Sequence, residues 1–295
     1  MASEAVAERR SAGHRLADLF HGRERLQVGA LLAGPIGWLV IGYLGSLALL
    51  LVAAFWSVEG FSGETIKSFT LENFESLVNE PVYRTIAWRT IRTALLVTLT
   101  DAVIAFPIAF YMAKVASRRG KALLVVGILL PLWSSYLVKV YAWRTLLSAN
   151  GALNWALEPL GLNGPGYGMT AVWLVMSYLW LPYMILPIYA GLERIPDSLI
   201  SASEDLGASP FTTFRRVILP LSFPAVVAGS IFTFSLTLGD YITPRLVSND
   251  QFIGNVIYNN LASNQPFAAA LALVPIVVMI AYLLVARKLG AFEHV

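Results

Sequence analysis

The chain has 295 residues, of which 57% are hydrophobic and only 13% are charged, and its net charge is +3. Several apolar runs reach the roughly 20 residues that a helix needs to cross a bilayer. This composition therefore indicates a polytopic membrane protein and leaves little room for a separate soluble domain, and the lack of cysteine excludes disulfides, thiolate metal sites and cysteine nucleophiles.

Six apolar runs predict an all-α fold with six transmembrane helices. The runs cover about residues 29–56, 91–115, 122–144, 170–192, 223–243 and 267–287. The first run is too long for the apolar part of a signal peptide, so we expect it to persist as a helix. We expect one transmembrane domain over residues 29–295, preceded by a cytoplasmic tail over residues 1–28. Kinks are expected at the prolines within the runs, which are Pro107, Pro131, Pro182, Pro187 and Pro275.

The distribution of Lys and Arg predicts the orientation in the membrane. Most of the 21 basic residues fall in the two terminal tails and in the connections after the second and fourth runs. An even number of spans places both termini on one side, and the excess of basic residues marks that side as cytoplasmic. The segment between the first two runs carries acidic residues and is predicted to lie outside.

A polar insert at about residues 196–220 interrupts the hydrophobic pattern on the cytoplasmic side. Asp197 is a candidate helix cap that accepts from free backbone N–H groups, and Gly207 is a candidate left-handed stop. Ser209 followed by Pro210 can start a second helix. The pattern predicts a helix, a glycine bend and an amphipathic helix. By spacing alone, a stiff loop between two spans explains it equally well.

The whole insert, "SASEDLGASPFTTFRRVILP" over 201–220, resembles the cytoplasmic signature of binding-protein-dependent ABC importer permeases. The matching positions are Ala202, Asp205, Leu206, Gly207, Ala208, Ser209, Ile218 and Pro220. The family's Glu-Ala-Ala triplet falls on Ser201, Ala202 and Ser203, so serine stands in place of the glutamate and of the second alanine.

This resemblance implies the type I importer permease fold and a place in the bacterial inner membrane. It implies that the insert is a coupling helix that docks onto a cytoplasmic ATPase. The implied docking residues are Ser201, Ala202, Ser203, Glu204, Asp205, Leu206, Gly207, Ala208, Ser209 and Phe211. The implied partners are two copies of the ABC ATPase, a second homologous permease, an external substrate-binding protein and the lipid bilayer, without nucleic acid.

No cofactor is expected in this chain. The glycine-rich stretch "GLNGPGYG" at 161–168 lacks the Lys and Ser/Thr that a phosphate-binding loop requires. ATP and Mg are therefore expected to bind to the partner ATPase.

Three further stretches are similar to the permeases of spermidine and putrescine importers. They are "FTLENF" at 69–74, "PLWSSYLVKVYAWRTLLSANGALN" at 131–154 and "FTFSLTLGDYITPRLV" at 232–247. The similarity implies that the cargo is a polyamine. Permeases for iron, phosphonate, opines or other small solutes share overlapping motifs, so they stay as alternatives.

Two aspartates within the apolar runs are candidates for the substrate pathway. A carboxylate near the bilayer centre costs about 2.5 to 3.5 kcal/mol on insertion scales and normally faces a polar interior or a partner. A polyamine would need carboxylates at intervals with aromatic walls between them. The candidates are Asp240, Tyr241, Asp101, Trp133, Tyr136, Tyr141 and Trp143. In the alternative interpretation, Asp240 caps a helix break beside Pro244 and the aromatic residues form an interfacial belt.

A catalytic site is not expected. The histidines, His14, His21 and His294, lie in the terminal tails, so neither a zinc site nor a Ser-His triad can form within the membrane. An ion-coupled secondary transporter would also explain six spans and buried acids. That class predicts broken helices repeated in two halves, and the sequence has no internal echo of this kind.

Overall fold

The computed structural model describes residues 24–60 and 63–288. The chain divides into two compact units, residues 1–53 and residues 54–295. The predicted charged tails fall largely in 1–23 and 289–295, outside the described residues. In the first unit, α2 (Glu24–Trp38), the π-helical segment η2 (Leu39–Leu44) and α3 (Gly45–Ala53) follow one another without a break. Its apolar stretch Leu31–Ala53 is long enough to span a membrane, as predicted.

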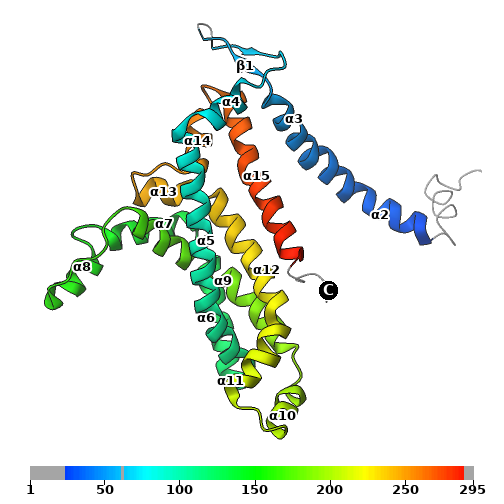
Figure 1. Cartoon of the computed structure of the whole chain (residues 1–295), viewed down its shortest axis with the longest axis vertical. Coiled ribbons are helices and arrows are strands. Elements are labelled where there is room, and N and C mark those ends of the chain that lie inside the picture. Colours follow the sequence, from blue (N-terminus) through cyan, green and yellow to red (C-terminus); the bar gives the residue numbers. More distant parts are fainter. Residues whose placement is uncertain (1–23, 61–62, 289–295) are drawn as a thin grey trace, which may run out of the picture. The chain divides into compact units, whose positions relative to one another are not determined.

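The second unit is a bundle of long helices, as predicted from the apolar runs (Figure 1). Its spans are α5 (Pro81–Phe110) continued by the π-turn η3 (Tyr111–Val115), α9 (Met169–Glu193), α11 (Pro210–Thr213) continued by the π-turn η5 (Phe214–Ile218) and α12 (Leu219–Gly239), and α15 (Gln265–Lys288). Two of these begin earlier than predicted, at Pro81 and Pro210. Proline fits the first turn of a helix, so hydropathy alone places both starts too late.

The third predicted span is a bent pair of helices instead of one straight helix. α6 (Arg118–Trp133) and α7 (Tyr136–Leu147) meet at 93°. Pro131 lacks a backbone N–H and the chain turns extended at Ser134. The Pro131 carbonyl accepts from Ser134 Oγ at 2.8 Å and from Lys139 Nζ at 3.1 Å, and these bonds stabilise the break. Within the described residues, the six predicted spans correspond to five long helices and this bent pair.

The centre of the bundle is the close packing of α5, α9 and α12. Small residues allow the helices to approach one another: Ala105 and Ala109 are fully buried. A side chain at Gly191 of α9 would place its Cβ 2.3 Å from Cβ of Ala225 in α12. A side chain at Gly229 would meet Met184 in the same way, with its Cβ 2.8 Å from the sulfur.

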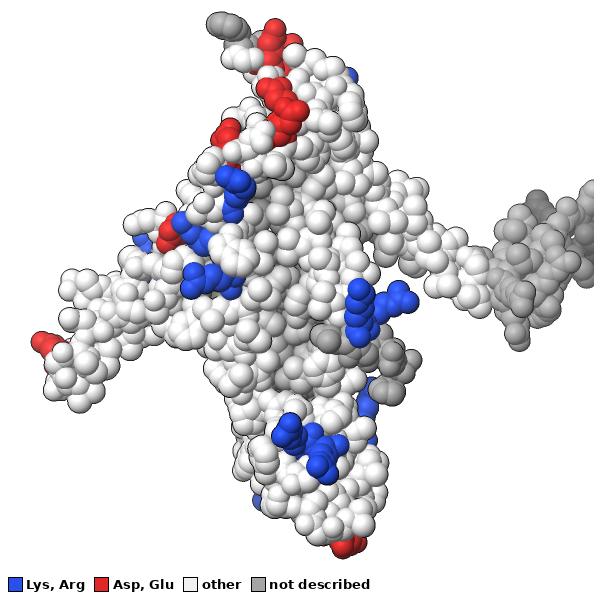
Figure 2. All heavy atoms as spheres, in the orientation of Figure 1, with Lys and Arg blue, Asp and Glu red and all other residues white. Residues whose placement is uncertain are grey.

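Short elements close the two ends of this unit. At one end lie α4 (Glu72–Asn79), α13 (Ile242–Val247), α14 (Ile253–Asn260) and a small antiparallel hairpin of β1 (Ser57–Val58) with β2 (Thr65–Ile66), paired Ser57 to Ile66. At the opposite end lie α10 (Asp197–Asp205) and α11. α8 (Ala152–Leu157) and the 3-10 turn η4 (Glu158–Leu160) follow α7. Acidic side chains gather at the β1 end, as Figure 2 shows.

Candidate functional site

Asp240 stands where α12 ends. The chain leaves the helix at this residue, with φ −73° and ψ 121°, and α13 begins two residues later. Its Oδ1 accepts from the backbone N–H groups of Ile242 at 2.9 Å and Thr243 at 3.1 Å. Its Oδ2 accepts from the Thr243 hydroxyl at 2.6 Å. Asp240 thus accepts from free backbone N–H groups at the start of α13, as the alternative in which it caps a helix break beside Pro244 predicts.

The bend in the third span brings Tyr136 onto this carboxylate. The Tyr136 hydroxyl donates to Asp240 Oδ1 at 2.6 Å, and Asp240 is 8% exposed. The ring of Tyr136 stacks on Trp180 of α9, with centroids 5.9 Å apart and planes 13° apart. Trp180 in turn contacts Tyr183 at 6.1 Å. Sequence reasoning included Tyr136 but missed Trp180, because the contact requires α7 to fold back onto α9.

Asp101 lies in the middle of α5 and faces the interior of the bundle. It is 0% exposed, and Ser177 of α9 faces it without reaching hydrogen-bond geometry. One turn before it, Val97 packs with residues that include Met176; one turn after it, Ala105 packs with Met184. Asp101 therefore lies at the level of Ser177 and Trp180 on the neighbouring helix.

Several buried polar side chains near Asp101 have atoms without a hydrogen-bond partner. Among the described residues, buried side-chain atoms without a hydrogen-bond partner occur on four residues of α5, α9 and α12: Asp101, Ser177, Trp180 and Thr233. Buried polar groups are normally hydrogen-bonded, and exceptions often mark functional sites. The structure therefore places a second carboxylate in a polar layer that includes the Trp180 nitrogen.

The other predicted aromatic residues separate into two groups. Trp143 packs against Tyr178 at 5.3 Å, and Tyr241 stacks on Tyr258 at 4.9 Å. Trp133 is 85% exposed and Tyr141 is 51% exposed on the surface of this chain. The structure thus joins Tyr136 and Asp240 directly and leaves Trp133 and Tyr141 facing outward.

The insert has the predicted form of helix, glycine bend and helix. α10 ends in a left-handed turn at Gly207, with φ +78°, which favours glycine. The Gly207 N–H donates to Glu204 O at 2.8 Å and the Ala208 N–H to Ser203 O at 3.1 Å, the pair of bonds that defines a Schellman cap. Ser209 caps α11 by accepting from Thr212 N–H at 3.3 Å.

A hydroxyl pair holds the two arms of the insert together. Ser203 Oγ lies 3.0 Å from Oγ1 of Thr213, which is 3% exposed. Serine at the third triplet position thus bonds within the insert, which an alanine there could not do. Leu206 and Phe211 are 89% and 70% exposed at the tip.

The expectation that Asp197 caps α10 is wrong. α10 begins at Asp197, as predicted, but its N-cap is Pro196, and the Asp197 carboxylate pairs with Lys114 of η3. Lys114 Nζ donates to Asp197 Oδ1 at 2.7 Å and to Ile195 O at 2.6 Å. The Lys114 ammonium group holds the pKa of the Asp197 carboxyl below its ordinary value. A second ion pair, Lys121 of α6 with Glu193 at the end of α9, has a distance of 2.8 Å.

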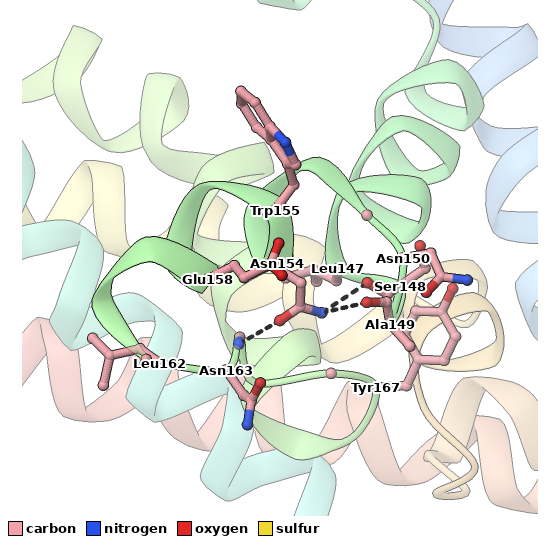
Figure 3. Close-up of a pocket in the computed structure, with 14 residues that line it drawn as sticks. Leu147, Ser148, Ala149, Asn150, Asn154, Trp155, Glu158, Leu162, Asn163 and Tyr167 are labelled. Carbon is pink, nitrogen blue, oxygen red and sulfur yellow. Dashed lines mark hydrogen bonds between the residues drawn. The ribbon is translucent and has the colours of Figure 1, made fainter.

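A pocket lies between the end of α7, α8 and the loop at 161–167, at the predicted outer side (Figure 3). Asn154 organises it: Nδ2 donates to Ser148 O at 3.0 Å and Ala149 O at 3.1 Å, and Oδ1 accepts from Gly164 N–H at 2.6 Å. Trp155 at its edge is 75% exposed. The volume of the pocket is about 910 Å³. The Asn154 amide thus ties the segment after α7 to the loop that contains Gly164.

Comparison with known proteins identifies the class of membrane protein. Residues 86–291 match the family model described as "Binding-protein-dependent transport system inner membrane component". The chain belongs to this family. It is therefore a permease subunit of an ABC importer and a multi-pass protein of the bacterial inner membrane, and the expected role of a non-catalytic membrane subunit is confirmed.

Curated relatives match over most of their length. The chain is 45% identical over 281 residues to the inner membrane ABC transporter permease protein YdcU of Escherichia coli, covering 89% of this chain and 90% of that protein. It is 32% identical over 244 residues to the spermidine/putrescine transport system permease protein PotB of Haemophilus influenzae, covering 80% and 84%. The corresponding Escherichia coli PotB is 30% identical over 258 residues, covering 85% and 93%.

Solved structures support the fold. A chain of the bacterial alginate ABC transporter, in complex with a pentasaccharide-bound periplasmic protein, superposes with a TM-score of 0.73 at 17% identity, covering 90% of this chain and 94% of that one. A chain of the inward-facing MetNI methionine ABC transporter gives a TM-score of 0.55 at 15% identity, covering 70% and 94%. The predicted type I importer permease fold is confirmed.

Proposed function

We propose that this permease subunit moves polyamines such as spermidine and putrescine into the cell. The curated relatives named PotB support this cargo class. The observation that carries the proposal is the sequence of groups across the bundle: a carboxylate at Asp240, the stacked rings of Tyr136 and Trp180, and a second carboxylate at Asp101 at the level of Trp180.

This arrangement suits a chain of methylenes with separated ammonium groups. A carboxylate offers about four acceptor positions over two oxygens. Asp240 Oδ1 already accepts three hydrogen bonds, whereas Oδ2 accepts one, from Thr243. Oδ2 can therefore accept an ammonium group, and the two aromatic faces attract both the methylenes and the cation. Asp101 then receives the next ammonium group as the helices part.

The remaining predicted pathway residues take supporting positions in this proposal. Trp143 packs on Tyr178 and Tyr241 stacks on Tyr258, so both are proposed to shape the surroundings of the central group instead of touching the cargo. Trp133 and Tyr141 line the path only from the outer surface of this chain, on the side proposed to meet a second homologous permease.

The insert is the proposed coupling element. The exposed tip, with Leu206 and Phe211, offers an apolar surface for a cleft on an ATPase. The anchor through Lys114 ties the insert to α5, so that a movement of the tip reaches the bundle as a rigid displacement. We propose two ATPase copies, which bind ATP and Mg, beneath the pair of permeases, and a transmembrane domain over 29–295 with a tail over 1–28.

The pocket around Asn154 is the proposed contact for the external substrate-binding protein. Its rim combines exposed apolar side chains with polar backbone groups, which is typical of a transient protein interface. On the predicted topology it faces the side from which the cargo arrives.

Reconstitution tests the cargo class. The complex copurified through this chain is placed in lipid vesicles with its binding protein, and ATP hydrolysis is measured with putrescine or with 1,4-butanediol, which has the same chain length without charge. Putrescine is expected to stimulate hydrolysis and the diol is not. Asp240→Asn should weaken the stimulation, whereas Glu75→Gln, at an exposed position of α4, should not.

Three outcomes would contradict parts of this proposal. Stimulation by another small solute and not by polyamines would assign a different cargo to the same permease. Equal stimulation in wild type and Asp240→Asn would remove Asp240 from the pathway. A complex that carries no ATPase would contradict the role of the insert.

A further inference from the structure

A groove lies between the outer ends of α5 and α9, away from the pathway and the insert. Its volume is about 380 Å³. Its lining residues are Thr85, Trp88, Arg89, Arg92, Thr93, Leu96, Met169, Thr170 and Trp173. Two arginines and two tryptophans at the outer ends of these two helices are a combination that the transport function does not use.

The depth of the groove follows from the length of α5. From Arg92 to Lys114 the helix rises about 33 Å at roughly 1.5 Å per residue, close to the hydrocarbon thickness of about 30 Å. Lys114 contacts the insert at the cytoplasmic end of the bundle. Arg92 therefore lies at the boundary between hydrocarbon and headgroups on the opposite side, the depth at which tryptophans are also enriched.

The face of α5 below Arg92 is apolar and exposed. Leu96, Leu99 and Val103 follow Arg92 at helical spacing on the side opposite the buried face of α5, and are 45%, 65% and 73% exposed. Trp88, one turn further out, is 65% exposed. The exposed face of α5 thus carries, in order toward the bilayer centre, the ring of Trp88, the guanidinium group of Arg92 and an apolar surface.

The charges at the groove are positive overall. Arg89 Nη1 lies 3.2 Å from Asp250 Oδ1 and donates to Gln251 O at 3.1 Å, which leaves its other N–H groups to the groove. Arg92 is exposed and has no ion pair within the part of the chain that the structure describes. Because the groove has two guanidinium groups and one carboxylate, it attracts an anion. The planar guanidinium group matches the geometry of a phosphate. Basic side chains gather beside the upper half of α5 in Figure 2.

We propose that this groove binds an anionic phospholipid of the outer leaflet, with its phosphate between Arg89 and Arg92 and an acyl chain along Leu96, Leu99 and Val103. A headgroup alone would use the arginines and leave Leu96, Leu99 and Val103 uncovered, and a neutral apolar helix would leave Arg92 without an anionic partner. The phospholipid satisfies both parts at the depth where they lie.

Lipid titration of the intact complex tests the proposal. The purified complex in mild detergent is titrated with phosphatidylglycerol or phosphatidylcholine, and bound lipids are counted by native mass spectrometry. Arg92→Gln is expected to lower the apparent affinity for phosphatidylglycerol about tenfold, the effect of losing one charge-assisted contact. Arg84→Gln is the matched control, because Arg84 is exposed on the same helix outside the groove. Arg92→Lys should restore part of the binding.

A photocrosslinker at Leu99 tests where the lipid lies and whether the neighbour of this face is lipid or protein. Leu99 is exposed and outside the bundle core. In vesicles of phosphatidylcholine with phosphatidylglycerol, crosslinks to lipid are expected, and Arg92→Gln should reduce those to phosphatidylglycerol. Crosslinks to a second permease chain would overturn the proposal and assign this face to the interface between permeases. Equal phosphatidylglycerol binding by wild type, Arg92→Gln and Arg84→Gln would overturn it as well.

Discussion

The hydroxyl of Tyr136 lies 2.6 Å from Oδ1 of Asp240, so the bend in the third span and the end of the fifth share one hydrogen bond. The same ring stacks on Trp180 of the fourth span. One side chain therefore joins three spans, and its two contacts can be separated by mutation.

Tyr136→Phe removes the hydroxyl and keeps the ring. Because the lost bond reaches a charged group, we expect a loss of about 1.5 to 3 kcal/mol in the free energy of unfolding, measured by thermal unfolding of the purified complex. Tyr141→Phe is the control, since Tyr141 is 51% exposed. Equal unfolding temperatures in both variants would show that the hydrogen bond contributes nothing measurable.

Gly207→Val should uncouple ATP hydrolysis from transport. Valine at φ +78° is strained by about 1 to 3 kcal/mol, and the bend of the insert must change to relieve this strain. We expect the cargo moved per ATP hydrolysed to fall several-fold while the complex still assembles. Gly63→Val tests the same backbone strain in the hairpin at the opposite end, with φ +70°. Normal coupling in Gly207→Val would contradict the role of the bend.

Lys114→Met should loosen the insert. The pKa of Asp197 is lowered by the Lys114 ammonium group, so the stabilisation is present above the ordinary value of 3.8 and is lost only as the pH falls through the lowered pKa. We therefore expect hydrogen exchange in 197–206 to be faster in Lys114→Met than in wild type at both pH 7 and pH 5. Wild-type opening, corrected for intrinsic exchange, should be the same at the two pH values.

The control for this prediction is Lys121→Met. It breaks the pair with Glu193 and leaves Asp197 with its partner. Protection of 197–206 that drops equally in both variants would mean that general charge loss, and not the anchor, controls the insert.

Asp101→Thr should stabilise the protein and impair transport. Both carboxylate oxygens lack a partner, whereas threonine can donate to the carbonyl one turn back, as Thr90 and Thr98 do at 2.9 and 2.7 Å. The free energy of unfolding should rise by about 1 to 3 kcal/mol, and polyamine uptake should fall. A lower unfolding temperature would mean that Asp101 has a structural partner; unchanged uptake would remove it from the pathway.

Local signals in the sequence predicted the insert well. Gly207 and Ser209 act through their own backbone and the next few residues, so their roles as stop and cap follow from residue type and position. The apolar runs likewise placed the spans, because the bilayer fixes the length that a helix must have.

Contacts between segments that lie far apart in the sequence decided which polar side chains pair, and sequence reasoning did not predict these pairs. Asp197 has the right type and place for a cap, but Lys114, from another helix, takes its carboxylate. The break after Pro131 depends on Lys139 reaching back to the Pro131 carbonyl, which hydropathy does not register. Trp180 gains its role only because that break turns Tyr136 toward it.

The sequence by itself determined the membrane class, the number of apolar runs, the helix–glycine–helix form of the insert and the family, since these depend on hydrophobic length and on short-range backbone preferences. Only the tertiary structure decided which polar side chains meet. A hydrogen bond requires its two atoms to approach within about 3 Å, and such a distance between spans is set by the packing of whole helices.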